Sequence, residues 1–233
     1  MLKEFTYEVP KIEKGYANQT LYVNLSDNTI KIKPVDEKMK ETFTGGKGFD
    51  LWLMWNGLPK DRIVKWDDPE NEICIATGPL GGAAQYPGAG KSVVTSISPM
   101  TGIVIDSNVG GYVGPNLKFS GFDAAEIQGK AEKDVYILID GDHGKVEIHD
   151  ASDLPDTAYE ITRVLGDRHT ELEGKDMAVA TAGPGSESEL LLVGYASESS
   201  SIQASWSWRN WHRLQKQESQ SYRCEVCQDY FES

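Results

Sequence analysis

The sequence predicts a mixed α+β fold, in which short strands and helices alternate without the regular strand–helix–strand rhythm of a doubly wound sheet. Two hairpin signals predict this class, because apolar runs flank a polar turn at Ser26–Asn28 and a glycine-bounded turn at Gly141–Gly144. A hydrophobic content of 39% over 233 residues is enough to bury a core. We therefore expect a folded domain rather than a disordered chain.

The first predicted elements lie between residues 20 and 55. Apolar and polar side chains alternate in Thr20–Leu25 and Thr29–Lys33, so these runs predict two antiparallel strands joined by a turn. A helix is predicted at Asp36–Phe43, and a second at Gly48–Trp55. The apolar face of the second helix is broad, which indicates that it packs on a core rather than binds a ligand.

The later elements follow the same two periodicities. Strands are predicted at Glu72–Thr77, Ser92–Ile97, Ile103–Asp106, Ala124–Gln128, Val135–Asp140, Lys145–His149 and Met177–Thr181. A short helix is predicted at Pro115–Phe119 and a longer one at Asp156–Leu165, where Ile161 and Leu165 share one side.

The composition excludes several classes of protein. The chain has 36 acidic and 23 basic residues, a net charge of -13, which argues against binding to nucleic acid or to an anionic membrane. No apolar run approaches the roughly 20 residues that span a bilayer, and the N-terminal segment has no apolar signal core, so we expect a cytoplasmic protein. Three cysteines are too few for a secreted disulfide framework.

Three glycine-rich loops are the strongest candidates for a binding site: Gly45–Gly48, Gly78–Gly90 and Asn108–Pro115. Glycine lets backbone N–H groups approach phosphate oxygens closely, particularly ahead of a helix. A single loop of this kind is more often a tight turn. Three such loops in one domain favour an anionic ligand.

The segment Gly88–Ser92 is not a nucleotide-binding P-loop. That motif requires a glycine where this chain has Gln85, and it requires a helix where Val93–Ile97 predicts a strand. This argues against a nucleotide hydrolase, although Lys91 can still contact a phosphate as a point charge.

The cysteines and histidines do not predict a metal site. Cys74 lies between Ile73 and Ile75 in an apolar strand and is expected to be a small buried hydrophobe. No second ligand stands at metal-binding spacing from the histidines His143, His149 and His169.

Six ordered motifs resemble the N-terminal domain of the tungsten-containing aldehyde:ferredoxin oxidoreductase family. They are Gly45–Gly48, Ala76–Leu80, Ser98–Gly102, Asp106–Pro115, Leu117–Phe119 and Gly121–Asp123. The resemblance runs from about residue 16 to residue 187 and includes Val146–Ser152 and Ala182–Gly185. It implies a domain at residues 1–187 with two intertwined β-rich repeats, which form a base under tungsten (or molybdenum) held by two pterins.

The resemblance also assigns cofactor-binding residues. Lys91 stands where the family has an arginine that contacts a pterin phosphate. The positive charge is therefore kept, but the two parallel hydrogen bonds that a guanidinium can donate are lost. Asn108 matches the asparagine whose backbone carbonyl faces the magnesium ion that bridges the pterin phosphates. Val109, Gly110 and Gly111 match the loop that lies against the pterin. No catalytic side chain is assigned.

Family members oxidise an aldehyde with water to a carboxylate and pass the electrons through a 4Fe–4S cluster to ferredoxin, in anaerobic metabolism. They are much longer, and their later domains supply the cluster ligands, which Cys224 and Cys227 cannot replace. We therefore expect an N-terminal fragment that is inactive alone. The alternatives are a non-catalytic module that binds a pterin or another phosphate ligand, and an acidic structural protein. A homo-oligomer is left open.

The C-terminal segment departs from the family. Tyr195–Ser233 contains neither glycine nor proline but has three closely spaced tryptophans, Trp206, Trp208 and Trp211. Because tryptophan has the single codon TGG, a frame displaced forward by one nucleotide converts all three to glycine. The displaced frame then resembles the glycine-rich stretch that closes the family domain. We hypothesise that the reading frame is lost between about residues 185 and 201, and that 188–233 is a disordered tail.

Overall fold

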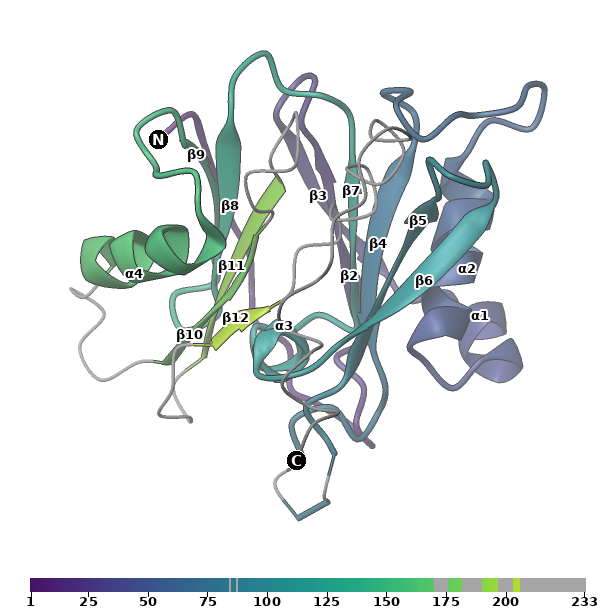
Figure 1. Ribbon diagram of the computed structural model, residues 1–233. Coiled ribbons are helices and arrows are strands. Elements are labelled where there is room, and N and C mark those ends of the chain that lie inside the picture. Colours follow the sequence, from purple (N-terminus) through teal and green to yellow (C-terminus); the bar gives the residue numbers. More distant parts are fainter. Residues whose placement is uncertain (84, 87, 170–175, 182–189, 197–202, 206–233) are drawn as a thin grey trace, which may run out of the picture.

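The computed structural model describes residues 1–83, 85–86, 88–169, 176–181, 190–196 and 203–205 (Figure 1). Its strands are β1 (Lys3–Thr6), β2 (Gln19–Asn24), β3 (Thr29–Pro34), β4 (Glu72–Thr77), β5 (Ser92–Ile97), β6 (Val104–Val109), β7 (Ala124–Gln128), β8 (Val135–Asp140), β9 (Lys145–Asp150), β10 (Asp176–Ala180), β11 (Leu190–Ala196) and β12 (Gln203–Ser205). Its helices are α1 (Glu37–Thr42), α2 (Lys47–Gly57), α3 (Val113–Phe119) and α4 (Ala158–Arg168).

The strands form two mixed sheets. The first has the order β3-β2-β7-β4-β5-β6 and the second the order β1-β9-β8-β11-β10-β12. Four neighbouring strands are arranged alike in both. A hairpin (β2–β3 or β8–β9) has a parallel strand beside it (β7 or β11), followed by an antiparallel one (β4 or β10). This repeated β-rich unit and the few helices confirm the α+β class.

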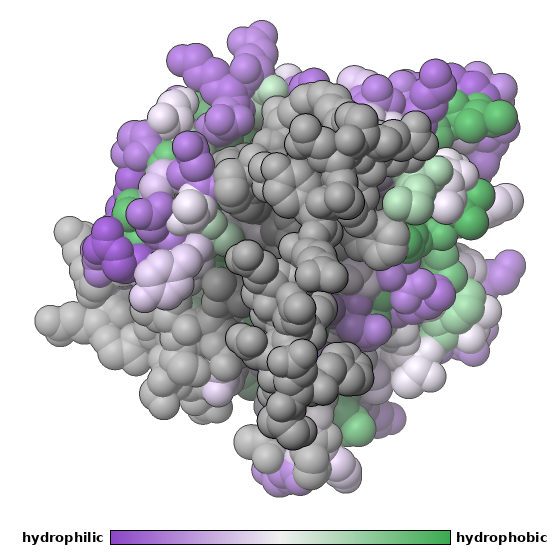
Figure 2. Space-filling view, viewed as in Figure 1, coloured by the Kyte–Doolittle hydropathy of each residue, from purple (hydrophilic) through white to green (hydrophobic). Residues whose placement is uncertain are grey.

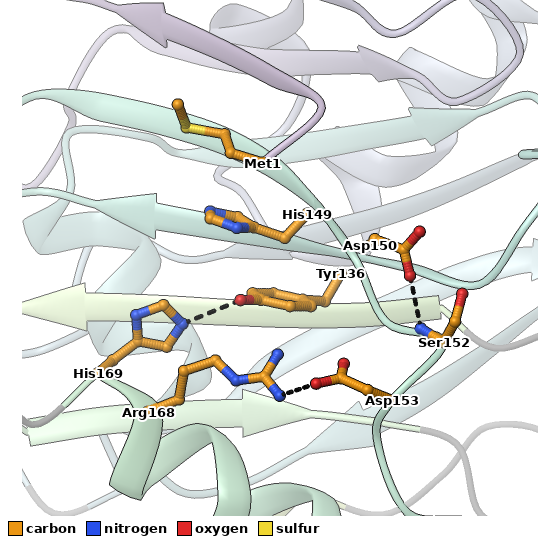
Figure 3. A pocket seen from close by; sticks show the side chains of 8 residues that line it. All are labelled: Met1, Tyr136, His149, Asp150, Ser152, Asp153, Arg168 and His169. Atoms are coloured by element: carbon orange, nitrogen blue, oxygen red, sulfur yellow. Dashed lines mark hydrogen bonds and ion pairs between the residues drawn. The ribbon is translucent and has the colours of Figure 1, made fainter.

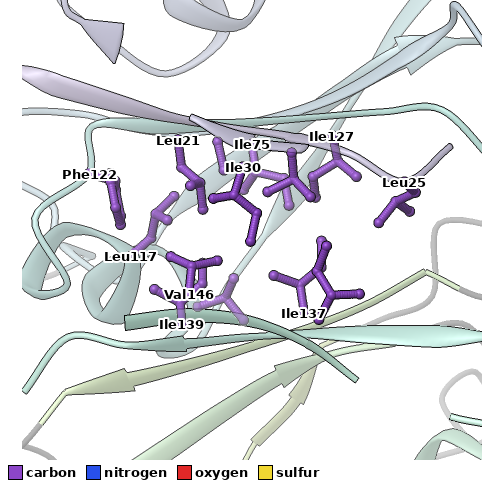
Figure 4. Close-up of a cluster of buried hydrophobic side chains, with 14 of the residues drawn as sticks. Leu21, Leu25, Ile30, Ile75, Leu117, Phe122, Ile127, Ile137, Ile139 and Val146 are labelled. Atoms are coloured by element: carbon purple, nitrogen blue, oxygen red, sulfur yellow. The ribbon is translucent and has the colours of Figure 1, made fainter. Parts of the chain in front are cut away.

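The core fills the space between the two sheets (Figure 4). Leu21 and Ile127 of the first sheet face Ile137 and Val146 of the second, and α3 adds Leu117 at one end. All five side chains are at most 3% exposed. Burial of each large aliphatic side chain stabilises the fold by about 1.5–3 kcal/mol, so this layer holds the sheets together.

The outer face of each sheet is covered by helix. α2 packs Phe49 and Met54 against the first sheet, and α4 packs Ile161 and Leu165 against the second. Among the described helices none is long and apolar enough to cross a membrane. Hydrophobic side chains gather at the surface on the side that carries α2 and β6 (Figure 2). Ile103 and Val104, 66% and 43% exposed, leave an apolar strip beside the edge strand β6.

Most predicted elements are confirmed, and four strands have the predicted bounds. These four are β4, β5, β7 and β8. One difference concerns the candidate site. β6 continues to Val109 instead of ending at Asp106, because it pairs with β5 along its whole length. Asn108 and Val109 therefore lie in a strand rather than in the following loop.

The structure also adds strands that the sequence pattern missed. β1 is a short and largely exposed edge strand that pairs with β9. β11 lies beyond the predicted boundary at residue 187, yet it pairs with β8 and β10, so the second sheet extends past that boundary. Residues 206–233 of the predicted tail lie outside the described residues.

Candidate functional site

The three glycine-rich loops meet at one end of the first sheet. In Figure 1 this is the lower end, where β4 stops, β5 starts and β6 runs toward α3. The loop before α2 joins them, because the Gly46 N–H donates to the Thr77 carbonyl at 3.2 Å. Segments spread over more than sixty residues of sequence thus come together at one place, where their backbone N–H groups can contact the same anion.

Two of these loops contact each other through bare backbone. A Cβ atom on Gly90 would lie 2.7 Å from the Gly111 carbonyl oxygen, so any side chain there would push the loops apart. Gly111 has a φ of 81°, which side-chain-bearing residues rarely adopt. Glycine is therefore required at both positions for the loops to lie this close.

Lys91 places a cation beside this backbone. Its Nζ lies 3.4 Å from the point where a Cβ on Gly110 would stand, and its side chain is exposed. Within the described residues Lys91 makes no ion pair, whereas Lys47 at the start of α2 is bound to Asp106 at 2.6 Å. Lys91 is thus a charge without a protein counter-ion at the junction of the loops.

The edge of the sheet exposes the backbone of Asn108. The Ser98 N–H donates to the Ile103 carbonyl at 2.8 Å, which fixes the alternation of hydrogen-bonded pairs between β5 and β6. With that register the bonded pairs are Ser96–Ile105, Val94–Ser107 and Ser92–Val109. The N–H and C=O of Asn108 therefore point away from β5, so its carbonyl is available to a ligand.

The structure brings four of the five predicted site residues together. Lys91, Asn108, Gly110 and Gly111 share this junction. The side chain of Val109 instead packs in the core between the sheets and is 9% exposed, so only its backbone belongs to the site.

A buried acid behind the loops was missed by the sequence pattern. Asp50 in the first turn of α2 is fully buried and accepts a hydrogen bond from the Thr95 hydroxyl at 2.8 Å. Burial raises the pKa of Asp50 well above its usual range, which favours the uncharged carboxyl. In the sequence, the signal for the burial of Asp50 is its position between Phe49 and Leu51 on an apolar helix.

A second hollow of about 520 Å³ lies on the outer face of the second sheet, beside α4 (Figure 3). There the Tyr136 ring stacks on His149 with ring centroids 4.8 Å apart, and its hydroxyl is 3.2 Å from Nε2 of His169. Arg168 pairs with Asp153 at 2.7 Å. None of the predicted site residues lines this hollow. In the described part of the chain no three His, Cys, Asp or Glu side chains could hold a metal ion.

The family model for the aldehyde ferredoxin oxidoreductase N-terminal domain matches residues 20–206. The chain belongs to this family. Its relatives include the tungsten-containing aldehyde ferredoxin oxidoreductases of Pyrococcus horikoshii, 35% identical over 76% of this chain, and of Pyrococcus furiosus, 37% identical over 74%. This aldehyde ferredoxin oxidoreductase domain spans 28% and 27% of the length of those relatives.

Another relative and a solved structure are named for other redox reactions. An aliphatic sulfonate oxidoreductase subunit of Pyrococcus furiosus is 36% identical over 59% of the chain and spans 22% of that relative. The active-site complex BamBC of benzoyl coenzyme A reductase shares the fold with a TM-score of 0.66 and 30% identity. That match covers 72% of this chain and 25% of the other.

The aldehyde ferredoxin oxidoreductase domain has a donor set that fits a phosphate-bearing cofactor. Gly90 and Gly111 leave a cradle that a Cβ would fill, and Lys91 supplies a cation beside it. The outward carbonyl of Asn108 is a hard oxygen ligand of the type that magnesium prefers. The residues present therefore fit a pterin phosphate with its bridging cation.

Proposed function

We propose that this chain is the N-terminal base of a tungsten (or molybdenum) bis-pterin oxidoreductase that oxidises aldehydes to carboxylates, with ferredoxin as the electron acceptor. The observation that carries the proposal is the junction of the glycine loops, where Lys91 stands beside the bare backbone of Gly110 and Gly111. Because the chain belongs to this family, we propose that the anions bound at this junction are the pterin phosphates.

Each residue at the junction has a distinct role in this proposal. Lys91 binds a pterin phosphate as a point charge, and the N–H groups of Gly110 and Gly111 donate to the cofactor. The Asn108 carbonyl binds the magnesium ion. When bound, the metal–pterin centre would supply the oxidation of an aldehyde by water, which yields a carboxylate, three protons and two electrons. The protein holds and orients the centre.

Catalysis on this proposal needs parts of the protein outside the present chain, which spans about a quarter of its relatives' length. On this proposal those parts hold a 4Fe–4S cluster that passes electrons to ferredoxin, as the family resemblance implies. Cys74 cannot ligate such a cluster because it is buried in β4. We therefore expect the chain alone to bind pterin but to show no aldehyde oxidation.

Cofactor retention tests this proposal. The full chain would be produced in an anaerobic host that makes the tungsten pterin, and its tungsten, molybdenum, pterin and iron would be measured after purification. We expect pterin without iron, with Lys91→Met lowering the pterin content at least about tenfold, since a charge-assisted contact is lost. Lys91→Arg should keep or raise it. Lys130→Met, an exposed lysine distant from the loops, is the matched control.

Equal pterin content in Lys91→Met and Lys130→Met, or no pterin in any variant, would contradict the proposal. Retention of inorganic phosphate in place of pterin would support the alternative of a general phosphate-binding module. Iron in a stoichiometric amount would contradict the assignment of the cluster to the missing domains.

We also propose that the reading frame changes after β11. That strand pairs with β8 from Leu190 to Tyr195, which supports a family reading frame up to that point. The forced conversion of three tryptophans to glycine begins at Trp206. Resequencing the DNA across codons 190–206 and beyond tests this. A one-nucleotide change that opens a long frame with further cysteines is expected, and an unchanged frame would refute it.

A further inference from the structure

A small pocket on the outer face of the first sheet is independent of the glycine loops and of the function proposed above. It has a volume of about 240 Å³ and lies between α1, α2 and the strands β2, β3 and β7. Its lining combines a polar floor with apolar walls. The floor includes Thr20, Lys33 and Glu126, and the walls include Met39, Trp52 and Leu53.

The floor holds a hydroxyl group that lacks a partner. Thr20 on β2 is 1% exposed, and its Oγ1 makes no hydrogen bond with the described residues. A buried hydroxyl without a partner costs free energy, so native proteins seldom retain one unless a water or ligand binds it. Thr20 therefore marks a position where a bound molecule supplies the missing hydrogen bond.

A neutralised carboxylate lies on the same floor. Glu126 on β7 has a side chain only 2% exposed, and its Oε2 accepts from Lys33 Nζ at 2.5 Å. The lysine is further held over the Tyr22 ring, 4.3 Å from its centroid. Oε1 of Glu126 makes no hydrogen bond within the part of the chain that the structure describes. The floor thus offers one acceptor oxygen and one hydroxyl, and the charge of Glu126 is balanced by Lys33.

The walls set the size and polarity of the ligand body. Met39 of α1 and Leu53 of α2 are 1% and 8% exposed, and Trp52 adds its indole ring. A volume of 240 Å³ corresponds to about eight water molecules of liquid, so a molecule of about five to eight heavy atoms fits. An alkyl chain on these walls removes apolar surface from water.

We propose that this pocket is a binding site for a small uncharged molecule with a hydroxyl head and a short alkyl chain, with the head on Thr20 and Glu126. A hydroxyl head can donate to Glu126 Oε1 and accept from the Thr20 hydroxyl at the same time. Asp36 also lines the pocket, but it is exposed and caps α1 through the Met39 N–H, and Lys33 already neutralises Glu126. A charged head on the floor would therefore be buried without a free counter-ion. The ligand class is therefore the short-chain alcohol, in preference to the amine or carboxylate of equal length.

Three probes of equal length test the charge preference. Butan-1-ol, butylammonium and butyrate would each be titrated into the isotope-labelled full chain, and amide chemical shifts followed by NMR. We expect butan-1-ol to shift the amides of residues lining the pocket with a dissociation constant of about 1–50 mM, as for a ligand of five heavy atoms. The two ions should bind at least about tenfold more weakly.

Two variants and a control localise the effect. Thr20→Val keeps the shape of the side chain but removes the hydroxyl, so it should weaken butan-1-ol binding at least about fivefold. Thr6→Val, at an exposed threonine of β1, should leave binding unchanged. Lys33→Met removes the counter-ion of Glu126 and should reverse the preference, so that butylammonium binds more tightly than butan-1-ol.

Each outcome decides the matter. No shift at the pocket up to 200 mM butan-1-ol, or equal binding of the alcohol and the ions, would overturn the proposal and leave ordered water as the occupant. If Thr20→Val fails to fold, the reversal in Lys33→Met still tests the charge argument. An unchanged order of the three probes in that variant would refute it.

Discussion

The two sheets share one pairing order but differ in what they bury beneath their outer helices. Under α2 the first sheet buries three carboxyl groups, those of Asp50, Glu72 and Glu126. Under α4 the described residues of the second half include a buried apolar cluster with Ile161 and Leu165, and the buried Thr162 hydroxyl donates within the helix to the Ala158 carbonyl. The same backbone scheme thus supports an apolar layer with three buried carboxyl groups in one half and an apolar layer around α4 in the other.

The difference follows the position of the candidate sites. The first sheet alone carries the extension β5–β6 and the glycine loops at its end, and it also holds the pocket around Thr20 and Glu126. Buried polar groups cost stability and persist where a site uses them. The second half, built around α4, contributes mainly packing.

Breaking the buried ion pair of the first half should lower the free energy of unfolding far more than breaking an exposed ion pair of the second half. Lys118 and Asp123 are 1% and 0% exposed and form an ion pair, and Asp123 also accepts from the Asn18 N–H at 2.7 Å. Asp123→Asn leaves a buried ammonium without a counter-ion and should lower the free energy of unfolding by about 3–5 kcal/mol in urea titrations. Asp153→Asn, which breaks an exposed pair with Arg168, should cost about 1 kcal/mol or less. Equal costs would contradict this difference between the two halves.

The apolar layer under α4 should be sensitive to cavities. Leu165 is fully buried against the second sheet, so Leu165→Ala should lower the free energy of unfolding by about 2–5 kcal/mol. Tyr159 on the same helix is 78% exposed, and Tyr159→Ala should change the free energy of unfolding by about 0.5 kcal/mol or less. Urea titration of both variants measures the difference. A loss below about 1 kcal/mol for Leu165→Ala would show that α4 does not depend on this packing.

The acids of the first half should make stability depend on pH. Burial, reinforced by the nearby Glu126, raises the pKa of Glu72 from 4.5 to about 8. The folded state then holds a proton that the unfolded state has released, so stability falls as the pH rises from about 5 to 8, by at most about 1.4 kcal/mol per pH unit. Glu72→Gln should flatten this dependence in urea titrations at pH 5, 6, 7 and 8. The exposed Glu132→Gln should leave it intact, and identical slopes in both variants would contradict the assignment.

The helix caps should give the smallest effect, and it should be similar in both halves. Asp36 accepts from the Met39 N–H at 3.1 Å to cap α1, and Thr157 accepts from the Glu160 N–H at 3.3 Å to cap α4. Asp36→Ala and Thr157→Ala should each cost about 1 kcal/mol of unfolding free energy. Thermal unfolding of both variants provides the comparison. A difference above about 2 kcal/mol would mean that one cap has a further role.

The sequence predicted the strands whose signals are local. β4, β5, β7 and β8 are short runs of mostly buried residues between turn signals, so their bounds can be predicted from the local sequence. β1 could not be predicted this way, because it is a short edge strand whose partner β9 lies far along the chain. β11 was assigned to the tail because its neighbours in sequence depart from the family pattern.

The candidate site was predictable in its residue types but not in its orientation. Glycine loops and Lys91 are visible in the sequence. The outward carbonyl of Asn108 depends on the register fixed by the turn from Ser98 to Ile103, which no local pattern encodes. The buried Asp50 and Thr20 were missed because polar residues are expected at the surface, and only the packing of α2 and α1 covers them.

The pairing of β1 with β9 also bears on how the chain folds during synthesis. Lys3 pairs with Ile148, so β1 leaves the ribosome well before the strand with which it pairs. The first sheet, from β2 to β7, closes within one continuous stretch and can form earlier. Long-range pairing of this kind slows folding. In that interval β1 is an unpaired strand, and its exposed lysine and glutamate, Lys3 and Glu4, disfavour its pairing with other chains.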